Sequence, residues 1–218
     1  MGLFKPAWQS KNPEKRKKAV EKLTDQSVLA EIAKNDEDKD VRMVAAERLT
    51  DQCVLADIAK GDDWCVRKAA SKRLTDQSIL ADVAKNAKNK NIRIALSKRL
   101  TDQSVLADIA KNDKNYYVRK AAAAKLTDQS VLADVAKNAK DKDIRIAALN
   151  KITMRNILTE IMNDDDDKKY KCTYTYTSHT SVSRLDSYGI EYSSGPITET
   201  IDLRDTARER LAELQKQS

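Results

Sequence analysis

The side chains that most often carry chemistry are few in this chain and do not cluster in the sequence. There is one histidine, His179, in a stretch rich in Thr and Ser. No Gly-rich phosphate loop, nucleophile motif or set of spaced metal ligands accompanies it. The run Asp164 to Asp167 lacks the spaced acids and the glycine of a calcium loop. We therefore expect no catalytic site, no metal site and no cofactor.

The cysteines and the hydropathy pattern limit the classes of protein to which this chain can belong. Cys53, Cys65 and Cys172 are scattered, without Cys-x-x-Cys spacing or a neighbouring His, which predicts reduced, structural thiols. No stretch reaches the roughly 18 apolar residues of a membrane span. The first residues lack the apolar run of a secretory signal. We expect a cytoplasmic protein without a membrane partner.

Aromatic and cationic residues four positions apart are the side chains best suited to bind a partner. The pairs are Trp64 and Lys68, Lys90 and Ile94, Tyr116 and Lys120, and Lys142 and Ile146. Residues at this spacing are neighbours on a helix, so each pair sets one cation against one large apolar or aromatic group. Stabilisation of a helix start explains the pairs about as well as binding does. Trp and Tyr are, however, enriched in binding hot spots.

The elements that position these pairs belong to an internal repeat. The motif Leu-Thr-Asp-Gln begins at Leu23, Leu49, Leu74, Leu100 and Leu126, and Ile152-Thr153 begins a degenerate sixth copy. Consecutive copies are 26 residues apart, except for one spacing of 25. Two short amphipathic helices per unit cannot stand alone in water, so each unit must stack on its neighbours.

Each unit predicts a first helix (A-type) and a second helix (B-type). In residues 126–151, Thr127 to Ser130 supply an N-cap with an acid in the first turn, and the A-type helix ends after Lys137. The next position holds Asn or Gly in every unit, which predicts a left-handed C′ cap. The B-type helix starts near a Val-Arg or Ile-Arg pair. Apolar residues at −1, +2, +3 and +7 from this Arg predict its buried stripe.

The ends of the chain modify the repeat within an expected single domain, 1–218. Residues 1–22 form a polar capping half-repeat, 23–151 are five regular repeats, and 152–218 are a sixth repeat that ends in a capping helix. The sixth repeat carries an insertion at about 164–200. Alternation in Cys172 to Thr177 predicts a strand, which Tyr188 to Tyr192 could pair with as a β-hairpin. The hairpin either covers the last helices or binds a partner.

Each unit has a pair of helices, an Arg at the start of the second helix and an Asp or Asn four residues before that Arg. This combination resembles HEAT-type repeats, in particular the short bacterial kind. The resemblance covers about 13–163 and resumes at 202. It implies an all-α fold, a right-handed α-α superhelix. In this family the Asp and Arg form a ladder between repeats. The matching arginines here are Arg42, Arg67, Arg93, Arg119 and Arg145. At two rungs of the ladder, that is, two of its Asp–Arg steps, Asn replaces Asp, which weakens the charge pairing there.

The resemblance also implies that the B-type helices line a concave groove. The predicted binding residues in this groove are Trp64, Lys68, Lys72, Ile94, Lys98, Tyr116, Tyr117, Lys120 and Ile146. The first expectation is a scaffold or adaptor that binds a protein or peptide there. A net charge of +7 and the groove lysines leave a second one open, binding of a nucleic acid backbone. The sequence does not indicate an oligomeric state.

Overall fold

The computed structural model describes residues 6–164, 170–176 and 197–217. It divides into two compact units, an N-terminal unit up to Leu126 and a C-terminal unit from Thr127. The A-type helices are α2 (Gln26–Asn35), α4 (Gln52–Lys60), α6 (Gln77–Asn86), α8 (Gln103–Asn112), α10 (Gln129–Asn138) and α12 (Arg155–Asn163). The B-type helices are α1 (Pro13–Val20), α3 (Lys39–Arg48), α5 (Trp64–Arg73), α7 (Lys90–Ser97), α9 (Tyr116–Ala124), α11 (Lys142–Asn150) and α14 (Leu203–Lys216). The prediction of a helical repeat architecture is confirmed.

Each regular A-type helix begins at the Asp of its Leu-Thr-Asp-Gln motif. The Oδ1 atom of Asp102, for example, accepts hydrogen bonds from the amides of Ser104 at 2.8 Å and Val105 at 3.1 Å. This Asp is itself the N-cap and satisfies two amide groups that the helix leaves open. The Ser104 hydroxyl and the Val105 amide bond the carboxylate and lower the pKa of Asp102.

The predicted left-handed cap at the end of the A-type helices is wrong. Asn86 is the last residue of α6, and Ala87 follows at φ −61° and ψ 135°, an extended conformation. The side chain of Asn86 instead donates to Asp82 one turn earlier, at 2.7 Å. This local hydrogen bond explains the recurring asparagine without a special backbone conformation.

Gly61 does not occupy the asparagine position, because the shorter unit lacks that residue. Its φ is −66°, and its carbonyl accepts a hydrogen bond from Arg67 at 2.7 Å. The Asp36 carbonyl accepts the same bond from Arg42. Gly61 is therefore the counterpart of Asp36, and the 25-residue spacing reflects a deletion at the end of α4. A Cβ here would lie 3.1 Å from the Ile58 carbonyl oxygen, so the shortened turn favours glycine.

The buried stripe of the B-type helices differs from the predicted one at a single position. Residues at −1, +3 and +7 from the Arg are buried as expected, for example Ile92, Leu96 and Leu100 in α7 and the residue that follows it. Position +2 is buried in α5, at Ala69, but is half-buried or exposed in the other units, for example at Ala95. Position +4 is buried instead, as Ser97 shows. Small residues at both positions hid this difference in the sequence.

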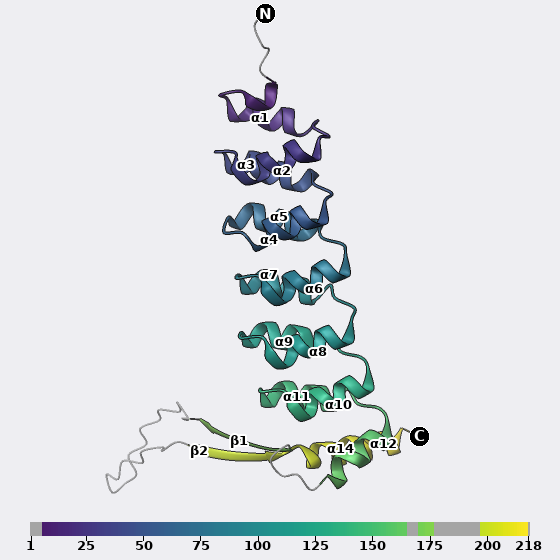
Figure 1. Ribbon diagram of the computed structural model, residues 1–218. Coiled ribbons are helices and arrows are strands. Elements are labelled where there is room, and N and C mark those ends of the chain that lie inside the picture. The colour runs from purple at the N-terminus through teal and green to yellow at the C-terminus, as the bar shows by residue number, and fades with distance from the viewer. Residues whose placement is uncertain (1–5, 165–169, 177–196, 218) are drawn as a thin grey trace, which may run out of the picture. The chain divides into compact units, whose positions relative to one another are not determined.

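Packing within the N-terminal unit, whose repeats follow one another in Figure 1, differs between successive pairs of repeats. The B-type helices approach closely at α1–α3, α3–α5 and α7–α9, whereas α5 and α7 make few backbone contacts. The A-type helices show the opposite order, with α4 and α6 close together and α2–α4 and α6–α8 further apart. The two repeats whose B-type helices are furthest apart, those of α5 and α7, therefore have A-type helices that lie close together.

The C-terminal unit contains α10, α11, α12 and α14 and an antiparallel strand pair, β1 (Lys171–Tyr176) and β2 (Ile197–Asp202). Helix α14 packs on α12 and α11, as a B-type helix of the sixth repeat should. Ala207 and Leu203 are fully buried there. The described partner of β1 is β2, whereas the predicted partner, 188–192, lies outside the described residues, as does His179.

Candidate binding surface

Exposed aromatic rings and lysines share one side of three consecutive B-type helices, α5, α7 and α9. We call this surface the B-face and define it by Trp64, Lys68, Lys72, Lys90, Ile94, Lys98, Tyr116, Tyr117 and Lys120. Trp64 is 59% exposed and Tyr117 is 61% exposed. Single exposed apolar residues are common, but two large exposed rings on the same side of α5 and α9 are a reason to expect a partner.

A lysine lies over each ring of the B-face. The Nζ atom of Lys68 is 5.0 Å from the Trp64 ring centroid, and that of Lys120 is 5.6 Å from Tyr116. Both distances lie within the range of a cation–π interaction. The predicted pairs within α5 and α9 therefore do form in the structure.

The sequence did not reveal that Lys90 pairs with the next repeat. Its Nζ lies 5.8 Å from the ring centroid of Tyr117, while Tyr117 and Tyr116 meet edge to face at 5.3 Å. The spacing of Lys90 and Ile94 pointed to a contact within α7 instead. This contact joins α7 to α9 and makes the rings and lysines of the two repeats one continuous surface.

Charge on the B-face has a single sign. Helices α5, α7 and α9 contain no Asp or Glu. Among the described residues, no carboxylate forms an ion pair with Lys68, Lys72, Lys90 or Lys98, and all four are exposed. Ile146 is half-buried on α11 in the C-terminal unit, and it stays a predicted binding residue outside the B-face.

Two A-type helices, α4 and α6, each pair a lysine with a carboxylate of the next repeat, in contrast to the four B-face lysines above. Lys60 bonds Asp82 of the next repeat at 2.5 Å, and Lys85 bonds Asp108 at 2.6 Å. Hydrogen bonds from these lysines hold the pKa of both carboxyls below the usual range. Lys60 and Lys85 therefore link neighbouring repeats by ion pairs, whereas Lys68, Lys72, Lys90 and Lys98 form no ion pair among the described residues.

The predicted arginine ladder uses different acids from those expected. Arg93 donates to Asp113 through Nε at 2.7 Å and Nη2 at 3.0 Å, and Arg16 pairs with Asp36 in the same way. These acids lie six residues before the next repeat's Arg. The residues four before it are N-caps, such as Asn89. Asp63 is both the N-cap of α5 and the acid that pairs with Arg42, and Gly61 at position −6 of that repeat supplies no acid.

Asp63 illustrates how this pairing affects ionisation. Burial opposes the charge on Asp63, but the hydrogen bonds from Arg42 and from the Val66 amide outweigh it and lower the pKa. The next repeat has no ion pair equivalent to Arg42–Asp63, because Asn89 occupies the position of Asp63.

Arg67 lacks a carboxylate on its rung. It is only 8% exposed, and its Nη1 donates to the carbonyls of Gly61 and Asp62. The Nε atom is buried without a hydrogen-bond partner among the described residues. The next repeat offers Ala87 at position −6 and Asn89 at position −4, so neither position supplies an acid. This rung lies where α5 and α7 make few contacts.

The remaining ladder arginines also bond carbonyl groups of the chain. Arg119 donates to the Asp113 carbonyl at 2.7 Å, and Arg145 donates from Nε to the Ala136 carbonyl at 2.7 Å. We interpret all five arginines as structural because they bond the chain itself.

A glutamine ladder that the sequence did not reveal also links the repeats. The Oε1 atom of Gln77 accepts from the Thr101 amide and hydroxyl, both at 3.1 Å, and its Nε2 donates to the Arg99 carbonyl at 3.4 Å. Gln26, Gln52 and Gln129 accept from the next repeat in the same way. Stacking thus explains the Thr and Gln of the motif.

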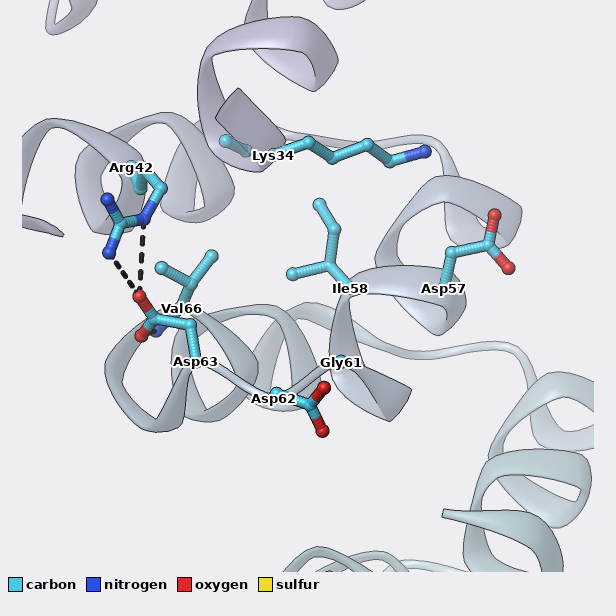
Figure 2. Close-up of a pocket in the computed structure, with 9 residues that line it drawn as sticks. Lys34, Arg42, Asp57, Ile58, Gly61, Asp62, Asp63 and Val66 are labelled. Atoms are coloured by element: carbon cyan, nitrogen blue, oxygen red, sulfur yellow. Dashed lines mark hydrogen bonds and ion pairs between the residues drawn. The ribbon is translucent and has the colours of Figure 1, made fainter. Parts of the chain in front are cut away.

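A cavity of about 300 Å³ lies between α2 and α4. Figure 2 shows the Arg42–Asp63 pair on one side of it and Asp57 on the other. Similar cavities occur between α6 and α8 and between α10 and α12. Their recurrence at the same kind of junction indicates that repeat packing creates them. The cavities therefore do not indicate a ligand-binding site.

No group of three or more His, Cys, Asp or Glu in the described part of the chain is arranged to hold a metal ion. None of its helices is both long and apolar enough to cross a membrane. Comparisons of the chain with protein-family models, with curated proteins and with solved structures found no match. The case for function therefore depends on the residues of this chain.

Proposed function

We propose that this protein is a HEAT-like interaction scaffold that binds a segment of another protein on its B-face. The observation that carries the proposal is the pair of exposed rings, Trp64 and Tyr117, each with a lysine over its face. Tryptophan and tyrosine supply a large contact area at low cost in conformational entropy. Neither ring is needed to fill the core.

The finer fold assignment is part of the same proposal. A right-handed α-α superhelix of the HEAT-like kind is favoured by the Arg–Asp rungs that link Arg16, Arg42 and Arg93 to the following repeats. In such a solenoid the B-type helices line the concave side, which suits an extended ligand.

A peptide-library selection tests the proposal. The wild-type protein and the variant Trp64→Ala/Tyr117→Ala would each be used to select binders from a displayed library of random 16-residue peptides. We expect the wild type to enrich specific peptides and the variant to lose them, with its thermal unfolding midpoint nearly unchanged. Met154→Ala is the matched control, since Met154 is 51% exposed but lies outside the B-face. Equal enrichment by all three proteins would rule the proposal out.

Nucleic acid binding is the second candidate, favoured by the absence of acids from α5, α7 and α9. Stacking platforms flanked by cations are typical of proteins that bind single strands. Such binding must weaken steeply as salt is raised. A labelled single-stranded oligonucleotide that is not retained even at low salt would exclude this candidate.

A further inference from the structure

We infer that the segment recognised by the B-face is acidic, with Asp or Glu side chains interspersed among apolar ones. This inference rests on the proposed function and names the chemistry of the partner. Its starting point is the unequal distribution of charge between the two kinds of helix. The lysines of α4 and α6 are paired with carboxylates, while Lys68, Lys72, Lys90 and Lys98 of the B-face have no carboxylate partner among the described residues.

Lysines without carboxylates on an acid-free surface create a positive potential that the chain does not neutralise itself. Lys68 and Lys72 lie one turn apart on α5, and Lys98 lies on α7, where Lys90 adds a further charge. A partner with carboxylates at matching positions would be steered to this surface and held in register. A partner rich in Lys or Arg would be repelled.

The aromatic rings prepare two of these lysines for binding. Lys68 is held over Trp64 and Lys90 over Tyr117, so their side chains have already lost part of their conformational freedom. A carboxylate that meets an ordered lysine incurs a smaller loss of rotamer entropy than one that must order a free lysine. The exposed parts of the rings then remain for apolar side chains of the same segment.

The kind of cation favours a polypeptide over a nucleic acid. Arginine is the residue best suited to phosphate groups, since its planar fork bonds two oxygens at once. In these helices Arg67 and Arg93 are buried and bonded to the chain, and Arg99 bonds the Ser71 carbonyl at 2.7 Å. The cations left exposed on the B-face are lysines. Ile94 lies among them and suits an apolar side chain better than a sugar-phosphate backbone.

Fluorescence anisotropy with defined probes tests the inference. The first probe is a labelled 16-residue peptide in which Glu alternates with Leu and Tyr, and the second is the same peptide with Gln in place of Glu. The third is a 16-nucleotide oligothymidine. We expect the Glu peptide to bind at least about tenfold more tightly than the Gln peptide. The Glu peptide should also bind more tightly than the oligothymidine.

Charge-reversal variants locate the site. Lys68→Glu/Lys98→Glu should weaken binding of the Glu peptide at least about tenfold. Lys22→Glu/Lys88→Glu makes the same change in net charge at exposed lysines outside the B-face, and we expect less than about a twofold effect. Lys68→Gln/Lys98→Gln, checked by circular dichroism, serves if charge reversal disturbs folding. Equal weakening by both reversals would overturn the inference, because it would reflect net charge alone.

The remaining outcomes separate this inference from the proposed function. If the Glu and Gln peptides bind equally and Trp64→Ala/Tyr117→Ala abolishes both, the inference fails while the scaffold proposal stands. Tighter binding of oligothymidine overturns the inference in favour of nucleic acid. If neither peptide binds and the library selection also enriches nothing, both proposals fail.

Discussion

Arg67 and Arg93 hold equivalent places in successive repeats but differ in their partners. Arg93 is 1% exposed and bonds both oxygens of Asp113, whereas the rung of Arg67 offers an alanine and an asparagine. A buried guanidinium group without a full set of partners lowers stability. Whether the rung is stabilising therefore depends on whether the following repeat supplies an acid to the arginine.

Supplying the missing carboxylate should stabilise the protein. One repeat earlier, Asp63 pairs with Arg42 from the position that Asn89 occupies here. Asn89→Asp would supply the same acid to Arg67, and Asp keeps the N-cap of α7. We expect an increase of about 1 kcal/mol in the free energy of unfolding, measured by urea denaturation.

Asn91→Asp is the control for that experiment, because it adds an acid to the same first turn at an exposed site. A general effect on the helix dipole would stabilise both variants alike. Equal gains would therefore show that Asn89→Asp does not act through Arg67.

Removing the acid from an intact rung should have a large effect. Asp113→Ala leaves the buried Arg93 with only the carbonyls of Ala87 and Lys88, and we expect a loss of about 3 kcal/mol. Asp108→Ala, which breaks the exposed pair with Lys85, should cost less than about 1 kcal/mol. Similar losses for the two variants would contradict the assignment of Asp113 to the ladder.

At the scale of the helix, the repeated N-cap makes stability depend on pH. Hydrogen bonds from Ser78, Ser104 and Ser130 lower the pKa of the capping carboxyls, which are Asp76, Asp102 and Asp128. A folded-state pKa below the unfolded value means that the stabilisation is present above about pH 4 and is lost as the pH falls further.

The triple variant Asp76→Asn/Asp102→Asn/Asp128→Asn tests this dependence, since Asn caps helices well and does not titrate. Between about pH 6 and pH 3, its unfolding midpoint should fall less than that of the wild type. Identical falls in the two proteins would show that the caps do not carry the effect.

Packing of the helices was only partly predictable from the sequence. The repeat, the N-caps and most of the buried stripe follow from residue type and spacing. The alternation between α3–α5 and α5–α7 does not, because it depends on which acids meet which arginines across repeats. Position −6 holds Asp36, Gly61, Ala87, Asp113 and Ala139. Reading this row as well as position −4 would have identified the rung acids.

The surface was predictable in its residues but not in its contacts. Trp64 and Lys68 follow from helical spacing, and their contact is confirmed. The contact of Lys90 with Tyr117 joins two repeats, so it depends on how α7 and α9 stack. Spacing within a single helix contains no information about such a contact.

At the scale of the whole chain, the division of labour between its residues supports the proposed function. The Asp, Gln and Arg residues that recur in each unit cap helices or bond the next repeat. The residues that vary between repeats include the rings and lysines of the B-face, most of which are exposed. This separation is typical of repeat scaffolds, in which the stacking residues are shared and the ligand-facing ones differ.

The fluorescence of Trp64 tests this central claim most directly. The chain has two tryptophans, so Trp8→Phe leaves Trp64 as the single reporter on the B-face. A peptide selected by the wild-type protein would be titrated into this variant, with binding followed independently by anisotropy of the labelled peptide. We predict that Trp64 emission shifts to shorter wavelength and becomes less accessible to acrylamide in proportion to binding. Saturable binding with unchanged Trp64 emission and quenching would contradict the account.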